Sequence, residues 1–262
     1  MIPGVNVLLM GAPGTGKTHA IRTLIDAGLE VFVLFTEPGM EVLADTPSDK
    51  LHWHYVAPAQ PSFDVLTKNA KMVNQFDAAT LQKQTNMNKA DYQQYLEVLS
   101  QCNNFQCQRC GKEFGCIDAW DTSRAFVFDS LSGLNIMLLD LVVGGKPLRT
   151  QPDWGIAMDN EERFLNKLTL GTRCHFILTA HVDRQVDEVL GGIKLMVNAL
   201  GKKLPPLVPR FFSDVILTVR EADEFSWSTA TANADTKARN LPWKTKQTPS
   251  FVPIINNWRP KQ

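Results

Sequence analysis

The sequence has 262 residues, 44% of them hydrophobic and 21% charged, which is typical of a soluble globular protein large enough to bury one α/β core. Basic and acidic side chains both number 27, so the net charge of zero gives no indication of a nucleic-acid partner. No apolar run reaches the roughly 18 residues of a membrane span, and no signal-like leader precedes the first apolar segment. We therefore expect a cytoplasmic protein without membrane contact.

Short apolar runs along the chain predict the strands of a buried sheet, and segments with apolar residues three and four apart predict helices. The predicted strands are residues 5–10, 30–35, 51–56, 125–128, 174–180, 214–220 and 225–232. The predicted helices between them are residues 18–27, 131–142 and 156–170. We expect the tail after Pro249 to be extended. Strands that alternate with helices predict an α/β fold with a mostly parallel central sheet flanked by helices.

Residues 61–120 depart from this pattern. Two polar helical stretches, residues 63–76 and 89–100, lead into the segment CNNFQCQRCGKEFGC at residues 102–116, which contains no long apolar run. We interpret 61–120 as a small helical, zinc-knuckle insertion in a single domain that spans residues 1–262.

Four of the five cysteines lie within this insertion, and their crowding favours a metal site over a disulfide framework. Cys107 and Cys110 form a C-x-x-C pair followed by glycine, which resembles a zinc knuckle. With Cys102 and Cys116 they offer four thiolates, the set that suits a closed, structural, tetrahedral Zn²⁺ site. The alternatives are a single redox pair or four reduced thiols in a loop.

Residues 11–18 read GAPGTGKT and match the phosphate-binding motif G-x-x-x-x-G-K-[ST] in full, between a predicted strand and a predicted helix. Its glycines let backbone N–H groups and the helix N-terminus surround a phosphate. Lys17 would place its charge on the β- and γ-phosphates of ATP, and the Thr18 hydroxyl would ligate Mg²⁺ (magnesium). The residues that we predict to bind the nucleotide are Gly11, Ala12, Pro13, Gly14, Thr15, Gly16, Lys17, Thr18 and His19.

Acidic residues at two strand ends complete the predicted ATP site. The apolar strand 125–128 ends in Asp129, which is the layout of a Walker B strand whose carboxylate holds Mg²⁺. Ser130 follows, whereas AAA+ enzymes usually place a water-activating glutamate there. Glu37 ends the second predicted strand, and neighbouring parallel strands end at one edge, so Glu37 is our candidate base. The alternative is an ordinary glutamate in a turn.

Together these features resemble the RecA family, in particular the small RecA-like ATPases of phages that are related to recombinases and single-strand annealing proteins. The resemblance rests on the P-loop, the glutamate after the second strand, the Asp-Ser end of the Walker B strand and the polar end of the next core strand. It implies a RecA-like P-loop NTPase core that binds single-stranded DNA for recombination, annealing or repair, in the cytoplasm of a bacterial host if phage-encoded. It also implies that His181 senses the γ-phosphate, with a solvated loop histidine as the alternative.

The same resemblance assigns DNA contacts and subunit contacts. Segments 144–155 and 182–204 correspond to DNA-binding loops, in which Trp154 either stacks on bases or packs against the core. Lys237 and Arg239 resemble a basic pair that reaches the neighbouring subunit's ATP site in trans. That role requires a homo-oligomer, either a ring or a filament. The alternative is a basic hairpin that is solvated or touches DNA phosphates.

Two other functions fit parts of the sequence. Nucleoside kinases of the zinc-containing type also combine a P-loop with four cysteines, but their zinc module follows the Walker B strand, whereas this cysteine cluster precedes it. A helicase loader, or an ATP-gated binding module that scarcely hydrolyses ATP, is the remaining alternative.

Overall fold

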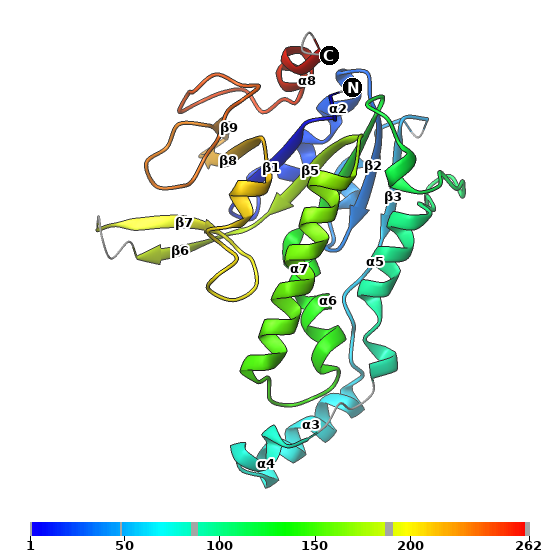
Figure 1. The fold of residues 1–262 in the computed structure, drawn as a ribbon, viewed down its shortest axis with the longest axis vertical. Helices are drawn as coiled ribbons and strands as arrows, with labels where there is room; N and C mark the ends of the chain where they lie inside the picture. The colour runs from blue at the N-terminus through cyan, green and yellow to red at the C-terminus, as the bar shows by residue number, and fades with distance from the viewer. Residues whose placement is uncertain (1, 48, 85–88, 187–190, 260–262) are drawn as a thin grey trace.

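The central sheet has seven strands in the order β3-β2-β4-β5-β1-β8-β9 (Figure 1). The structure is a computed structural model that describes residues 2–47, 49–84, 89–186 and 191–259. The strands of this sheet are β1 (Asn6–Gly11), β2 (Glu30–Phe35), β3 (Leu51–Tyr55), β4 (Arg124–Asp129), β5 (His175–Ala180), β8 (Asp214–Glu221) and β9 (Glu224–Ser228). Neighbours from β3 to β8 run parallel, and β9 runs antiparallel to β8. The predicted α/β fold with a mostly parallel sheet is confirmed.

Each central strand is buried on both faces, which explains its continuous apolar sequence. Leu8 and Met10 of β1 pack into the apolar cluster on one face, whereas Val7 and Leu9 pack into the cluster on the other. The helices on the first face are α5 (Gln94–Asn103), α6 (Leu131–Val143) and α7 (Gln151–Gly171). Those on the second face are α1 (Lys17–Ala20), α2 (Arg22–Asp26) and α8 (Val252–Trp258). Within the described residues, every helix is too short or too polar to cross a lipid bilayer.

Residues 61–120, predicted as one insertion, divide into two parts that differ in burial. Two helices of the first part extend away from the sheet (Figure 1), namely α3 (Phe63–Gln75) and α4 (Ala78–Gln82). In the second part, Phe105 and Trp120 pack on Phe32 of β2, with ring centroids 5.3 and 4.2 Å away. The second part therefore belongs to the main core. Single aromatic side chains make this contact, so no apolar run marked it in the sequence.

The segment 144–155, predicted as a loop, is shorter than expected because α7 begins at Gln151. The backbone N–H and the hydroxyl of Thr150 both donate to Oδ2 of Asp153, at 2.7 Å each, and form a capping box with it. The T-x-x-D sequence at residues 150–153 therefore marks the start of a helix within the predicted loop. The described residues also include the short 3-10 helices η1 (Met40–Leu43), η2 (Lys89–Asp91), η3 (Ile117–Ala119) and η4 (Val208–Phe211).

The segment 182–204, also predicted as a loop, contains a β-hairpin. Strand β6 (Val182–Val186) pairs antiparallel with β7 (Ile193–Val197), and the hairpin projects away from the central sheet (Figure 1). Residues 187–190 of this prediction lie outside the described residues. The segment does follow β5 as predicted, but its described residues include two paired strands where a loop was expected.

The C-terminal tail is helical, and the prediction of an extended tail is wrong. Phe251, Ile254, Ile255 and Trp258 recur at helical spacing, and all four are buried in the cluster on the face of α2. Pro253 stands in the first turn of α8, where a missing N–H costs little. The prolines that suggested an extended tail thus mark a helix start.

We predict that Trp258→Ala lowers the free energy of unfolding by about 3–5 kcal/mol, because it empties a large buried site. The Trp258 ring lies edge-on to His175 at 4.7 Å, and its Nε1 donates to the carbonyl of Pro3 at 3.1 Å. Trp243, which is 61% exposed, provides the control. Urea unfolding should show a change below about 0.5 kcal/mol for Trp243→Ala. Equal effects of the two substitutions would contradict the packing of α8.

Candidate nucleotide-binding site

The P-loop, Glu37, Asp129 and His181 meet because their strands are parallel and end at one edge of the sheet. In the register of the sheet, Phe35 pairs with Asp129 and Met10 pairs with Ala180. The functional residues therefore stand at or just after the ends of their strands, at the same level of the sheet. They surround a cleft of about 420 Å³, lined by Pro13, Gly14, Thr15, Gly16, Lys17, Thr18, His19, Glu37, Pro38, Val42, Asp129, His181 and Phe225. Of the predicted nucleotide-binding residues, only Gly11 and Ala12 lie outside this lining.

The P-loop is held in shape by tight contacts that exclude larger side chains. Gly16 has φ 82°, a left-handed conformation that favours glycine, and it precedes the first residue of α1. A methyl group at Gly11 would stand 2.0 Å from Oγ1 of Thr218 on β8. Thr218 also shares a 2.6 Å hydrogen bond with Oγ1 of Thr15. Strand β8 therefore supports the loop from beside β1.

Lys17 is the cationic group of the cleft, and burial perturbs it. Its Nζ donates to the backbone carbonyls of Gly11 and Ala12, both at 2.9 Å. Burial lowers the pKa of Lys17 to about 8, although the charges of Asp129 and Glu37 act in the opposite direction. An arriving polyphosphate would favour the protonated form.

Asp129, at the end of β4, contacts both the P-loop helix and β5, the strand that lies between β4 and β1. Its Oδ2 accepts a hydrogen bond from Oγ1 of Thr18 at 2.7 Å, and its Oδ1 accepts one from Oγ1 of Thr179 at 2.5 Å. Burial raises the pKa of Asp129, and the two hydroxyl donors lower it. Thr18 and Asp129 thus bring two oxygen ligands to one point, which fits Mg²⁺ because this ion prefers oxygen ligands and keeps several waters. Thr179 was missed in the sequence because a threonine inside an apolar strand carries no motif.

Glu37 and His181 form a polar chain that ends at Lys17. Oε2 of Glu37 accepts a hydrogen bond from Oγ of Ser130 at 2.6 Å and lies 3.3 Å from Nε2 of His181. The other ring nitrogen of His181, Nδ1, lies 3.4 Å from Nζ of Lys17. The hydrogen bond from His181 lowers the pKa of Glu37, and the Ser130 hydroxyl adds to this effect against the cost of burial. Glu37 is therefore a carboxylate at neutral pH, the form that can accept a proton from water.

Phe225 lines the cleft and was not identified from the sequence. A methyl group at Gly16 would lie 3.2 Å from its ring, so the tip of the β8–β9 hairpin stands over the P-loop. The guanidinium of Arg220 lies 5.4 Å from the centre of the same ring. Nothing in a strand-like sequence indicates that one of its aromatic residues reaches across to a loop two hundred residues earlier.

Lys237 and Arg239, predicted to act together on a neighbouring subunit, differ in their surroundings. Nζ of Lys237 donates to the carbonyls of Pro209 and Phe212, at 3.0 and 2.8 Å, at the end of η4. This ammonium is therefore engaged within its own chain, and the role of Lys237 in trans stays a prediction. Arg239 is exposed, and its backbone N–H donates to Oδ1 of Asp214 at 2.8 Å.

The basic residues of segment 144–155 are also engaged within the chain. Lys146 pairs with Asp153 at 3.1 Å, Arg149 lies 3.9 Å from Asp140, and Trp154 packs against the core. Of the two roles weighed for Trp154, its position supports packing.

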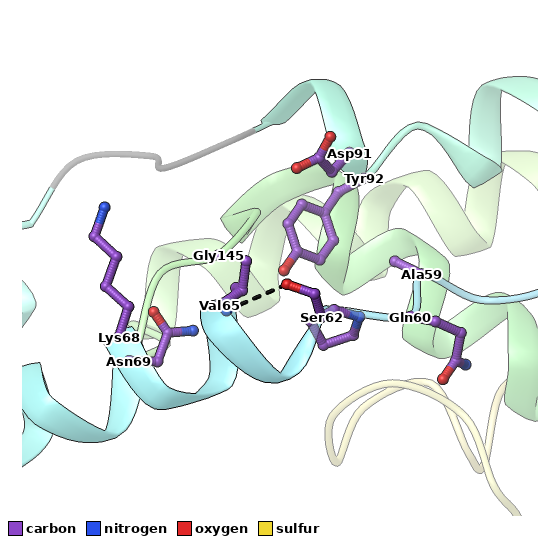
Figure 2. A pocket seen from close by; sticks show the side chains of 10 residues that line it. Ala59, Gln60, Ser62, Val65, Lys68, Asn69, Asp91, Tyr92 and Gly145 are labelled. Carbon is purple, nitrogen blue, oxygen red and sulfur yellow. Dashed lines mark hydrogen bonds between the residues drawn. The ribbon is translucent and has the colours of Figure 1, made fainter.

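A second cavity, of about 590 Å³, lies beside this segment and not beside the P-loop. Its lining includes Ser62, Lys68, Tyr92 and Gly145, and Figure 2 shows Tyr92 and Ser62 pointing toward each other across it. Gly145 follows the end of α6, whose 13 residues span about 20 Å from the Asp129 edge. This cavity is therefore too far away to hold the phosphates, despite its size.

The four predicted zinc ligands do not form one group. Among the described residues, Cys107 and Cys110 cluster with His52 of β3, within 4.8 Å of one another, and Cys102 and Cys116 lie outside this group. Burial raises the pKa of the Cys102 thiol to about 12. His52 was missed because it lies fifty residues earlier, in a strand with no metal-binding motif.

This fold and this site together define a P-loop ATPase domain of the AAA type. The sequence profile described as AAA domain matches residues 4–248, and the chain belongs to that family. No curated protein matches the chain.

Several solved structures resemble the chain. One, reported as a structural and biochemical analysis of a prototypical ATPase from the type III secretion system of pathogenic bacteria, has 14% sequence identity and a TM-score of 0.41. The similarity covers 83% of this chain and 53% of that chain. The chain thus spans about half the length of that protein.

We predict that ATP affinity falls as the pH rises above about 8. Because the folded protein lowers the pKa of Lys17 from 10.5 to about 8, the free site loses its positive charge in that range. Bound phosphates favour the charged form, so binding takes up a proton and weakens by up to about tenfold per pH unit. Calorimetry of Mg-ATP binding from about pH 7 to 9.5 measures this slope.

Lys17→Arg is the control for this prediction, because arginine stays charged throughout the range. Its affinity should be independent of pH, whatever its absolute value. A flat profile in the wild type, or the same slope in Lys17→Arg, would show that another group is responsible.

Proposed function

We propose that this protein is a cytoplasmic ATPase that acts on single-stranded DNA in recombination, annealing or repair, as a phage-type relative of the RecA family. The observation that carries the proposal is the position of His181. Its ring lies between Lys17 and Glu37, and the next residue, Val182, begins the β6–β7 hairpin. A change at the γ-phosphate can therefore be transmitted directly to a projecting hairpin.

In the proposed reaction, each residue of the cleft has a separate task. Lys17 balances charge on the β- and γ-phosphates, and Thr18 and Asp129 hold Mg²⁺, which when bound withdraws further charge from them. The Glu37 carboxylate orients the attacking water and accepts its proton. Ser130 and His181 fix the direction of that carboxylate through the 2.6 and 3.3 Å contacts.

The β6–β7 hairpin is the better of the two candidate DNA contacts. Arg184 is exposed on β6, whereas the basic residues of segment 144–155 already have acidic partners. Lys194 on β7 pairs with Asp235 at 2.9 Å, which leaves Arg184 as the residue to test. A cation on a hairpin beside the γ-phosphate site suits contacts with a DNA backbone.

The proposed function predicts that single-stranded DNA stimulates ATP turnover and that Arg184→Ala reduces this stimulation without changing basal turnover. Arg163→Ala is the control, because Arg163 is exposed on α7 and pairs with the nearby Asp159. ADP formation, the product common to hydrolysis and to phosphoryl transfer, is measured with single-stranded DNA, with duplex DNA and with thymidine. Turnover that responds to thymidine would instead favour the nucleoside kinase, and a rate indifferent to all three would contradict a DNA-dependent ATPase.

We predict that Lys17→Ala and Glu37→Gln fail at different steps. Lys17→Ala should lose ATP binding together with turnover, because it removes the charge that faces the phosphates. Glu37→Gln should bind ATP normally but hydrolyse it about 10²–10⁴-fold more slowly, the usual contribution of a general base. Binding and single-turnover rates, measured in parallel, separate the two effects. Near-normal turnover in Glu37→Gln would remove Glu37 from the role of base.

We further propose that the protein acts as a homo-oligomer, a ring or a filament, in which Arg239 reaches the neighbouring ATP site. Among the described residues that line the cleft, Lys17 is the one lysine or arginine, so a second cation for the transition state must come from elsewhere. Arg239 lies beside Asp214, which pairs with Val7 in the sheet. That level is four residues, or about 13 Å, below the P-loop edge, which suits a head-to-tail neighbour better than its own site.

Arg239→Ala should therefore bind ATP normally and lose about 10³-fold in turnover. Mixing it with Glu37→Gln should restore partial activity, since the intact arginine of one chain can complete the intact base of the other. Arg173→Ala, an exposed arginine just before β5 at the same end of the sheet, is the control and should be fully active. Unchanged turnover in Arg239→Ala, or no recovery in the mixture, would exclude action in trans.

A further inference from the structure

We propose that His52, Cys107 and Cys110 bind one Zn²⁺ ion that fastens the loop at 105–116 to the edge strand of the sheet. This site replaces two of the four predicted cysteine ligands, Cys102 and Cys116, with His52 of β3. It joins residues more than fifty positions apart in the chain, and it is independent of the proposed ATPase function.

The distances between the three side chains fit a tetrahedral zinc ion. Sγ of Cys110 lies 3.6 Å from Nδ1 of His52, and all three ligand atoms lie within 4.8 Å of one another. Zinc bonds of about 2.3 Å to sulfur and about 2.0–2.1 Å to nitrogen, at tetrahedral angles, separate the two ligand atoms by about 3.6 Å. The observed spacing is therefore that of two ligands on one metal ion.

The backbone around Cys107 has the geometry of a metal knuckle. The N–H of Gly111 donates to the carbonyl of Cys107, and the N–H of Cys107 donates to the carbonyl of Lys112, both at 2.9 Å. Gly111 has φ 70°, so the turn needs glycine at that position.

His52 is oriented as a metal ligand by a carboxylate on its far side. It is 3% exposed, and its Nε2 lies 3.4 Å from Oε1 of Glu30 but makes no hydrogen bond of good geometry. Glu30 is itself fixed by Arg124, whose Nε donates to it at 2.7 Å. A carboxylate behind a histidine selects the tautomer with the proton on Nε2, which leaves Nδ1 free to face the two sulfurs.

The chemistry of the three ligands selects zinc. Two thiolates and one imidazole suit Zn²⁺ better than Mg²⁺ or Ca²⁺, which prefer oxygen. The site lies near the start of β3, where Phe32 pairs with His52, at the end of the sheet away from the P-loop. The Phe114 ring, 4.3 Å from the His52 ring, packs the same loop against it. The ion would therefore link this loop to β3 at a distance from the P-loop, and its three protein ligands would leave the fourth position open to water.

The first test is zinc analysis and X-ray absorption of the purified wild-type protein. We expect about one zinc per chain with two sulfurs at about 2.3 Å and two nitrogen or oxygen atoms at about 2.0–2.1 Å. This measurement needs no variant, so a folding failure cannot obscure it. A first shell of four sulfurs, or a folded protein without zinc, would overturn the proposal.

Substitutions provide the second test. His52→Ala and Cys107→Ser should lose the zinc, whereas Cys102→Ser and Cys116→Ser should keep about one per chain. The last two are matched controls, since they remove thiols on either side of the group, at the end of α5 and before η3, that lie outside it. Loss of zinc in either control, or its retention in His52→Ala, would show that the four cysteines hold the metal instead. A disulfide between Cys107 and Cys110 in the purified protein would equally contradict the site.

Discussion

The site depends on one buried carboxylate, that of Asp129. Its two oxygens accept hydrogen bonds from Thr18 on the P-loop helix and from Thr179 on β5, the strand that separates β4 from β1. A buried carboxylate without such partners would be strongly destabilising, so these hydroxyls and the sheet register must form together. The P-loop is therefore held against the Walker B strand before any nucleotide binds.

In the nucleotide-free site, the charged side chains near Asp129 contact one another or the backbone. Lys17 donates to the carbonyls of its own loop, while His181 lies between Lys17 and Glu37. A γ-phosphate competes for the contacts that Lys17 and His181 make in this state. In the mechanism that we propose, ATP binding displaces His181 and moves the hairpin that begins at Val182. His181 and Val182 would then connect the nucleotide site directly to the projecting β6–β7 hairpin.

The parts of the molecule that sequence reasoning identified are those encoded by local pattern. The P-loop, the Asp129 strand and the parallel sheet follow from contiguous motifs and apolar runs. The α8 helix, by contrast, was obscured by prolines, and the core position of Phe105 and Trp120 depends on single aromatic contacts with Phe32. The cluster of His52 with Cys107 and Cys110 arises only when β3 is placed beside the loop. Tertiary contacts between distant segments decided the cases of Phe105, Trp120 and His52, whereas α8 had a local signal in the helical spacing of its apolar residues.

The central claim is that the γ-phosphate replaces His181's contacts in the free site, and a crystal structure with Mg²⁺ and a non-hydrolysable ATP analogue tests it most directly. The account predicts a ring nitrogen of His181 within about 3.2 Å of a γ-phosphate oxygen. It also predicts Thr18 and Asp129 beside the metal, with a water between Glu37 and the γ-phosphorus. A complex in which His181 still bridges Lys17 and Glu37, without touching phosphate, would contradict the account.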